Sequence, residues 1–310
     1  MLEMKRMKGS PPVAKAHQAE DRFVLVAIGE ILWDIFPDGR RIGGAPANFA
    51  YYVQALGERG VTVSKVGKDI EGEEILTFIR EAGLEIRFIG ADEIHPAGRV
   101  TVRLDGLGVP RFTIHDNAAW DHLALTPEIL DLAGRADAVC FGTLAQRSDE
   151  TRKTVRLFLR HTQERCLRIL DINLRQSDLS AEIIEESLRL SRVLKLNYEE
   201  LNTVATLFGW TIDETRVISL LFRRFPLELI ALTRGDQGSR LYTREAFSDC
   251  PAEAVIVVDT VGAGDSFTAA VAIGMLRREC LDEINRRANR VAGFVCSKRG
   301  AWTELPGDVI

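Results

Sequence analysis

The sequence predicts an α/β fold: a three-layer α/β/α sandwich with a mainly parallel central sheet and a small added β-sheet. Three observations predict it. Continuous apolar runs, which suit strands buried on both faces, alternate with helical patterns along most of the chain. Residues 98–115 instead alternate apolar with polar side chains, as a half-solvated hairpin does. The length of 310 residues is ample for a large core.

The elements expected in the first part of the chain alternate between strand and helix. Phe23 to Ile28 is an uninterrupted apolar run that ends at Gly29, as expected of a strand buried on both faces. Glycine ends the two helices that follow, and proline opens the first of them. After the strand at 23–28 we expect a helix at 46–56, a strand at 61–66 and a helix at 71–82.

The pattern changes at 98–115. Val100, Val102 and Leu104 alternate with polar residues, two glycines follow, and Phe112 and Ile114 alternate again. This pattern predicts a β-hairpin with one solvated face. We expect it to form a small sheet attached to the main body.

Beyond Thr126, apolar strands and helical patterns alternate again. This alternation predicts a mostly parallel sheet with helices on both of its faces. Strands are expected at 138–141, 167–172, 193–196, 229–232 and 254–258, and the last two helices at 265–276 and 281–297.

Composition excludes several classes of function. The net charge is −5, and no run of Lys and Arg is long enough to bind nucleic acid or a membrane surface. No apolar run approaches the ~18 residues of a membrane helix. The five cysteines are scattered without a CxxC pair, so we expect reduced thiols and a cytoplasmic protein. Residues 1–21 are expected to be a flexible leader before one domain at 22–310.

The most informative segment is Asp259-Thr260-Val261-Gly262-Ala263-Gly264-Asp265-Ser266-Phe267, which joins an expected strand to an expected helix. Its two glycines allow a tight turn, so several N–H groups point into one concavity at the positive end of the helix. Such a concavity binds phosphate, and Asp265 beside it could accept a hydroxyl proton. An anion site with an adjacent base is what phosphoryl transfer to an alcohol requires.

Two other interpretations of this segment stay open. A dinucleotide fingerprint, GxGxxG, would use Gly262 and Gly264, but Phe267 stands where that fingerprint needs a small residue. The segment could also be a purely structural turn in which Asp265 only caps the helix. A Walker-type phosphate loop is excluded, because GxxxxGK[ST] occurs nowhere in the sequence.

With these residues in place, the sequence resembles the ribokinase-like (pfkB) family of carbohydrate and nucleoside kinases. Residues 259–267 resemble the C-terminal signature of the family, and Gly43-Gly44-Ala45-Pro46-Ala47-Asn48-Phe49-Ala50 resembles its N-terminal signature. The latter, with Asp171-Ile172-Asn173-Leu174-Arg175, looks most like bacterial fructokinases, although those usually carry proline where this chain has Ile172. The resemblance spans about 23–306 and implies ATP and Mg²⁺ as cofactors.

The resemblance implies a role for each matching residue. Asp265 would be the catalytic base, while Gly262, Ala263 and Gly264 would form the anion hole for the γ-phosphate. The sugar hydroxyls would be held by Asp34, Gly44 and Asn48. The ATP site would comprise Asn197, Thr233, Gly235, Gly238, Gly262, Gly264 and Asn289. Glu200, of an NxxE motif, would hold Mg²⁺ through water, and K⁺ would be held by Asp259, Val261 and Gly300. A sugar-site lid would come from about 31–43 and 98–115.

Three further residues are candidates for binding the substrate. Asn173 and Arg175 follow a strand end, where ligands of open α/β sheets gather, and Arg175 could instead form only a surface salt bridge. Arg103 on the hairpin could touch the sugar or only solvent. Taken without the resemblance, Asp34 would be a turn residue and Asn197 a helix cap.

The expected reaction is therefore transfer of the ATP γ-phosphate to a primary hydroxyl of a small sugar, with fructose as the first choice. Ribose, a nucleoside, 2-keto-3-deoxygluconate or a sugar phosphate stay open as acceptors. A sugar phosphate would need cations on the lid, and the candidates are Arg99, Arg103 and Arg111. A ligand-binding protein without turnover is the alternative from another class. The exposed hairpin could also form a homodimer through the lid.

Overall fold

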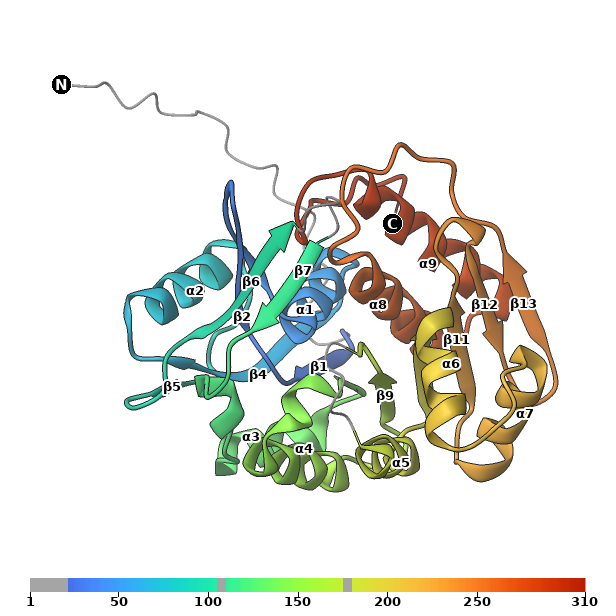
Figure 1. The fold of residues 1–310 in the computed structure, drawn as a ribbon, viewed down its shortest axis with the longest axis horizontal. Helices are drawn as coiled ribbons and strands as arrows, with labels where there is room; N and C mark the ends of the chain where they lie inside the picture. The colour runs from blue at the N-terminus through green and yellow to red at the C-terminus, as the bar shows by residue number, and fades with distance from the viewer. Residues whose placement is uncertain (1–21, 105–109, 175–179, 310) are drawn as a thin grey trace.

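The computed structural model of the chain describes residues 22–104, 110–174 and 180–309, with the backbone alone at 102–104 and 110–112. The predicted leader at 1–21 and Arg175 lie outside these ranges, as do the side chains of Arg103 and Arg111. Within them the chain forms two sheets flanked by helices (Figure 1). The predicted sandwich with a small added sheet is confirmed.

The large sheet is mostly parallel and has nine strands within the described residues. In spatial order the strands are β13 (Phe247–Cys250), β12 (Ser239–Tyr242), β11 (Leu229–Thr233), β10 (Val193–Asn197), β9 (Leu167–Asp171), β8 (Ala138–Phe141), β1 (Val24–Ile28), β4 (Arg59–Gly67) and β5 (Ile89–Asp92). The central strands are the predicted apolar runs. All neighbouring pairs from β11 to β5 are parallel, whereas β12 and β13 add an antiparallel edge.

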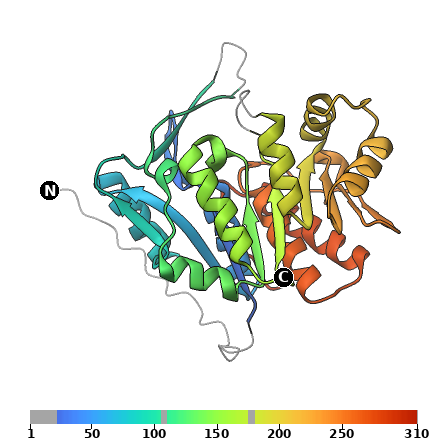
Figure 2. The same ribbon diagram turned by 90° about the horizontal axis from the view of Figure 1, so that it is seen from below.

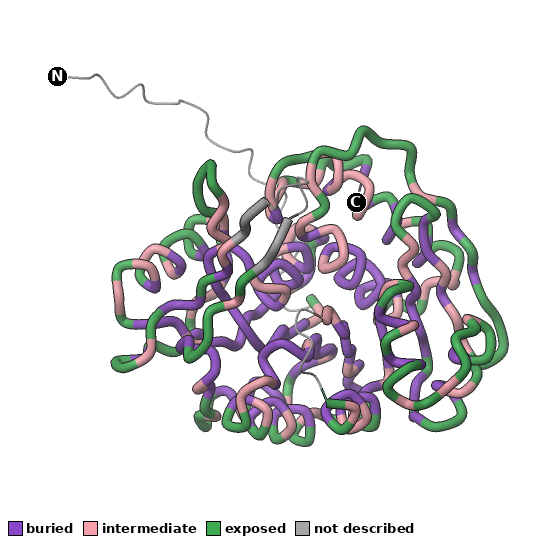
Figure 3. The backbone as a smooth tube through the Cα atoms, viewed as in Figure 1, coloured by how far each residue is buried: buried purple, intermediate pink, exposed green. Residues whose placement is uncertain are grey.

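Helices cover both faces of this sheet because its strands carry apolar side chains on both sides. One core lies under α1 (Ala45–Ala55), α8 (Ala263–Leu276) and α9 (Leu281–Cys296). The core on the other face lies under α3 (Pro127–Arg135), α4 (Asp149–His161), α5 (Ala181–Leu190), α6 (Tyr198–Leu207) and α7 (Glu214–Arg224). Figure 2 shows the green and yellow-green helices across this second face, and Figure 3 shows the central strands buried between the layers.

The small sheet has the order β3-β2-β6-β7 within the described residues. Its strands are β2 (Leu32–Phe36), β3 (Gly39–Gly43), β6 (Gly98–Leu104) and β7 (Pro110–Ile114). Helix α2 (Ile70–Glu81) packs with the base of this sheet and with β4 in a third core that contains Trp33 and Ile75. Short 3₁₀ helices occur at Ala119–His122, Leu144–Arg147 and Gly235–Gln237. No helix in the described ranges has the length and apolarity needed to cross a membrane.

One predicted strand, 254–258, is wrong. The apolar run Val255 to Val258 belongs to no sheet and is exposed, Ile256 to 86%. The reason is that the end of α9 supplies its partner: the amides of Val258 and Asp259 both donate to the carbonyl of Cys296, the last residue of that helix. The apolar composition indicated a strand, but the backbone hydrogen bonds of the segment go elsewhere.

Candidate active site

The glycine turn, Gly262–Gly264, begins helix α8, as the sequence predicted. Gly262 caps the helix with φ +80°, and a Cβ added there would lie 2.6 Å from the carbonyl oxygen of Ala301. Both the backbone angle and the close approach therefore require glycine. The first amides of a helix have no partner within it and carry the positive end of its dipole, so this turn is suited to bind an anion.

Asp265 lies in the first turn of α8 and is half-buried. The side-chain amide of Asn48, on the first turn of α1, donates to its carboxylate over 2.8 Å. The other end of that amide accepts a hydrogen bond from Nε1 of Trp302, also over 2.8 Å. The two signature segments are thus joined directly at the start of two packed helices.

Asp34 lies on β2, next to the glycine pair that precedes α1. A Cβ added at Gly43 would lie 2.2 Å from a carboxylate oxygen of Asp34, so the side chain fills the space that glycine leaves. Gly44 caps α1 with φ +105°, where an added Cβ would lie 2.6 Å from the carbonyl of Glu30. The structure therefore brings Asp34 against the Gly43–Gly44 segment that leads into Asn48.

A buried ion pair lies beside the glycine turn on the α8 face of the large sheet. Nζ of Lys195 donates to Asp171 over 3.0 Å, and the hydroxyl of Thr268 on α8 donates to the other oxygen of Asp171, also over 3.0 Å. Burial lowers the pKa of Lys195, but the carboxylates of Asp171, Glu200 and Asp265 raise it further, and the net pKa lies above the usual value. Lys195 is therefore a buried cation near the predicted anion site.

Asn197 and Glu200 form a capping box at the start of α6. Asn197 Oδ1 accepts from the amide of Glu200 at 2.8 Å, and a Glu200 oxygen accepts from the amide of Asn197 at 2.7 Å. The other Glu200 oxygen accepts from the amide of Leu174 at 2.9 Å. Burial raises the pKa of Glu200 above its usual value. Each oxygen keeps a second lone pair, so the carboxylate fits a metal held through water.

The strand-end residue Asn173 follows β9 and adopts φ +45°, a left-handed backbone that asparagine tolerates better than most residues. It is half-buried and directly precedes Leu174, whose amide binds Glu200. Asn173 is thus the sequence neighbour of a residue that hydrogen-bonds to Glu200 of the α6 capping box.

The predicted nucleotide residues lie at the end of β11 and on α9. Thr233 is the last residue of β11, and Gly235 and Gly238 bracket the turn that follows, with φ +60° and +84°. Asn289 is buried and donates to Ser239 and Asn285, so its amide nitrogen is engaged within the protein.

Asp259 binds two backbone amides just before the glycine turn. Its carboxylate accepts from Val261 at 3.1 Å and from Gly300 at 2.9 Å, which brings the three predicted K⁺ residues together. Over the described ranges no group of three or more His, Cys, Asp or Glu side chains is arranged to hold a metal ion.

Two residues of this region escaped the sequence prediction. Trp302 lies beyond the last predicted helix, where nothing in the local pattern indicates that it contacts Asn48. Lys195 carried a usable signal, since it is the one charged residue in the apolar run Val193–Leu196. A charge at an inward position of a buried strand needs a partner or a function.

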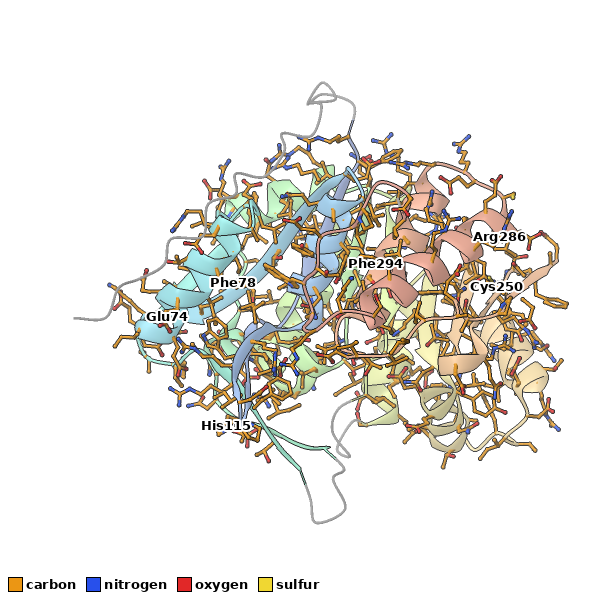
Figure 4. All side chains as sticks on the ribbon, turned by 90° about the horizontal axis from the view of Figure 1, so that it is seen from above. Glu74, Phe78, His115, Cys250, Arg286 and Phe294 are labelled. Atoms are coloured by element: carbon orange, nitrogen blue, oxygen red, sulfur yellow. The ribbon has the colours of Figure 1, made fainter. Side chains whose placement is uncertain are left out.

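A separate groove of about 710 Å³ lies between α2 and the small sheet. Trp33, Arg40 and Phe78 are among its lining residues. Trp33 precedes Asp34 on β2, and neighbouring residues of a strand face opposite sides, so the groove lies on the other face from Asp34. Figure 4 shows Glu74 and Phe78 on α2, at the opposite side of the view from Arg286 on α9.

Comparison with known proteins identifies the family. The profile of the pfkB family carbohydrate kinases matches residues 38–307. The chain belongs to this family and is a pfkB carbohydrate kinase. The resemblance read from its two signature segments is thereby confirmed.

Individual relatives agree with this assignment. A Pyrococcus horikoshii protein named as a putative sugar kinase is 31% identical over 299 residues, which cover 90% of this chain and 92% of the relative. A fructokinase from Klebsiella pneumoniae is 29% identical over 299 residues, which cover 90% and 95%. The crystal structure of the Pyrococcus horikoshii protein superposes with a TM-score of 0.78 at 30% identity, covering 90% of this chain and 93% of that one. A further structure of that protein is a complex with ATP. The structure of an Escherichia coli protein named as a putative ribokinase II, in complex with ATP and Mg²⁺, matches at a TM-score of 0.79 and 21% identity, covering 90% and 94%.

Proposed function

We propose that this carbohydrate kinase transfers the γ-phosphate of ATP to a primary hydroxyl of a small sugar, with fructose as the substrate, and that it works in the cytoplasm. The observation that carries the proposal is the position of Asp265, in the first turn of α8 at the glycine turn and bonded to Asn48. A carboxylate beside an anion site suits proton removal next to an incoming phosphoryl group.

In the proposed reaction, Asp265 accepts the proton of the sugar hydroxyl. The hydroxyl oxygen forms a bond to the γ-phosphorus, and the bond from that phosphorus to the β,γ-bridging oxygen breaks. ADP leaves with the electron pair, and the proton on Asp265 passes to solvent. The amides of the glycine turn hold the oxygens of the transferred group, since they point to the helix end where negative charge is stabilised.

The chain also offers residues for Mg-ATP. Thr233, Gly235 and Gly238 follow the carboxyl end of β11, the edge at which ligands of open α/β sheets bind. Glu200 would hold Mg²⁺ through water, because each of its oxygens already binds one backbone amide. The bound Mg²⁺ would neutralise phosphate charge. Support comes from the relatives that were crystallised with ATP or with ATP and Mg²⁺.

The sugar would lie between the small sheet and α1. Asp34 and Asn48 offer an acceptor carboxylate and an amide on either side of the Gly43–Gly44 segment, and Asn173 lies at the neighbouring strand end. The choice of fructose rests on relatives such as the fructokinase of Klebsiella pneumoniae. Closure of the small sheet over the sugar would exclude water from the reaction.

The decisive experiment is an ATP-consumption assay of the purified protein with fructose, ribose, a nucleoside, 2-keto-3-deoxygluconate and fructose 6-phosphate. We expect fructose to give the highest kcat/KM. We expect Asp265→Asn to lower kcat by about 10³-fold while leaving ATP affinity nearly unchanged. An Asp131→Asn control, on the exposed face of α3, should behave as the parent does. Turnover by Asp265→Asn within threefold of the parent would exclude the proposed base.

Two further parts of the proposal concern K⁺ and assembly. Asp259, with the backbone at Val261 and Gly300, would hold K⁺ and thereby stiffen the glycine turn, so replacing KCl by choline chloride should reduce kcat. The small sheet has open edges at β3 and β7, and we propose that two copies pair through it. Light scattering coupled to gel filtration measures the assembly directly, and a monomer mass at all concentrations would exclude it.

A further inference from the structure

Lys195 is a buried charge in β10, where the other residues before Asn197 are apolar. It is 9% exposed, and its neighbours Leu194 and Leu196 are fully buried in the core beneath α6. Val193 packs in the other core, beneath α8, and the alternation of a strand puts Lys195 on the same face as Val193. Burying an ammonium group costs free energy unless it has a partner, so its presence on this face calls for a reason.

The ammonium lies against the glycine turn. A Cβ added at Gly264 would be 3.0 Å from Nζ of Lys195. Since Cβ atoms of a helix point toward its N-terminus, Nζ lies on the side of Gly264 at which the first amides of α8 emerge. Because Gly264 has no side chain, the ammonium of Lys195 can lie against the start of α8. Its full positive charge is thus at the same end of the helix as the positive end of the helix dipole.

Asp171 binds the ammonium, and Thr268 in turn holds Asp171. Lys195 and Asp171 are register partners in the parallel pair β9–β10, and Nζ donates to Asp171 over 3.0 Å. Thr268, one turn after Gly264, donates to the other oxygen of Asp171. Among the described residues Asp171 is the one acceptor that Nζ contacts, and an ammonium group has three N–H donors. If the Lys195–Asp171 pair served only the packing of the sheet, the other N–H donors of the ammonium would have no acceptor within the described part of the protein.

We propose that Lys195 is a phosphate-binding residue of this kinase: its ammonium donates to the terminal phosphate of the nucleotide at the glycine turn, and Asp171 and Thr268 position it. This rests on the proposed kinase function, because the anion in question is the transferred phosphoryl group. The amides of the turn supply partial charges, whereas Lys195 supplies a full charge from a buried position, where a charge acts more strongly than in water.

The test compares Lys195→Met with a matched control, Lys65→Met. Lys65 on β4 also pairs with a buried aspartate, Asp92, at 2.5 Å, but it belongs to the other end of the large sheet. We expect Lys195→Met to lower kcat about 100-fold or more and to weaken Mg-ATP binding about tenfold by calorimetry, with adenosine affinity unchanged. Lys65→Met should lose thermal stability and keep kcat and the ratio of ATP to adenosine affinity.

A second variant guards against misfolding. Lys195→Met leaves Asp171 buried without its cation, so Lys195→Met combined with Asp171→Asn removes the orphan charge and should fold, with the same loss of ATP affinity. An unchanged ratio of ATP to adenosine affinity in the folded variants would overturn the role of Lys195. If the parent phosphorylates none of the acceptors, the sugar-kinase proposal fails, but the affinity ratio still decides whether Lys195 binds phosphate.

Discussion

The side-chain amide of Asn48 donates a hydrogen bond to the carboxylate of Asp265 over 2.8 Å, although the two residues are 217 positions apart. The orientation of that amide is fixed from its other end, where its oxygen accepts from Trp302. The nitrogen must therefore face Asp265. Because α1 and α8 share one core, the packing of the two helices maintains this contact between the signature segments.

Replacing Asn48 by Asp tests this contact through the pH dependence of the reaction. Asn48→Asp places a second carboxylate within hydrogen-bond distance of Asp265. Two carboxylates at such a short distance share one proton, which raises one of their pKa values. We therefore expect the acid limb of kcat/KM to move up by about one pH unit or more. The measurement is a pH–rate profile from pH 5 to 9.

The control for that profile is Gln163→Glu, which makes the same amide-to-carboxylate change at an exposed position after α4. It should leave the acid limb in place. An unmoved limb in Asn48→Asp as well would show that Asp265 is not the group whose ionisation governs the rate.

Trp302 orients Asn48 and so affects Asp265 indirectly, through the side-chain amide of Asn48. Trp302→Phe deletes the Nε1 donor but keeps an aromatic ring stacked on Tyr51, whose centroid is 4.7 Å away. A neutral hydrogen bond contributes about 1 kcal/mol, so we expect kcat/KM to fall about fivefold with little change in thermal stability. Trp210→Phe, on the opposite face of the large sheet, should leave kcat/KM unchanged. Equal effects of the two variants would contradict an orienting role.

The sequence predicts those parts of the structure that depend on neighbouring residues, and it misses those that depend on contacts between distant segments. The glycine turn and the buried strands are local patterns, and the structure contains them within one or two residues of the expected bounds. The exposed run Val255–Val258 has the same apolar composition, but its backbone bonds to the end of α9, a contact that no local pattern encodes.

The same limit applies to the candidate site. Asp265 and Asn48 could be named from their segments, whereas their hydrogen bond depends on how α1 packs against α8. Asp171 and Lys195 belong to different strands, and only the register of β9 on β10 makes them partners. Residues whose function depends on sheet register or on the path of the C-terminal segment, such as Trp302, are the ones that sequence patterns miss.

Gly43 offers a test of the sugar site that depends on space alone. Its φ is not in the left-handed region, so Gly43→Ala strains no backbone, but the added Cβ would lie 2.2 Å from a carboxylate oxygen of Asp34. Asp34 must move, and we expect the KM for the sugar to rise about tenfold or more with ATP affinity unchanged. Gly134→Ala, in α3 with open space around it, should stabilise the protein by about 0.5 kcal/mol and leave KM unchanged. A normal sugar KM in Gly43→Ala would remove Asp34 from the site.

The buried thiols predict a loss of stability at alkaline pH. Burial raises the pKa of Cys166 to about 12, and burial together with Asp171 and Asp265 raises the pKa of Cys140 well above its usual 9.0. In the unfolded chain these thiols ionise near pH 9, whereas in the folded chain they stay protonated. The folded state thus binds more protons between the two values, and the free energy of unfolding must fall as pH rises above 9.

Each such thiol contributes a slope of about 1.4 kcal/mol per pH unit in that window. Urea unfolding from pH 8 to 10.5 measures the slope, and Cys166→Ala should reduce it by about that amount. Cys280→Ala, which removes an exposed thiol, should leave the slope as it is in the parent. Because both variants lose one thiol, a difference between their slopes isolates the effect of burial, and equal slopes would mean that Cys166 ionises as freely in the folded protein as in the unfolded chain.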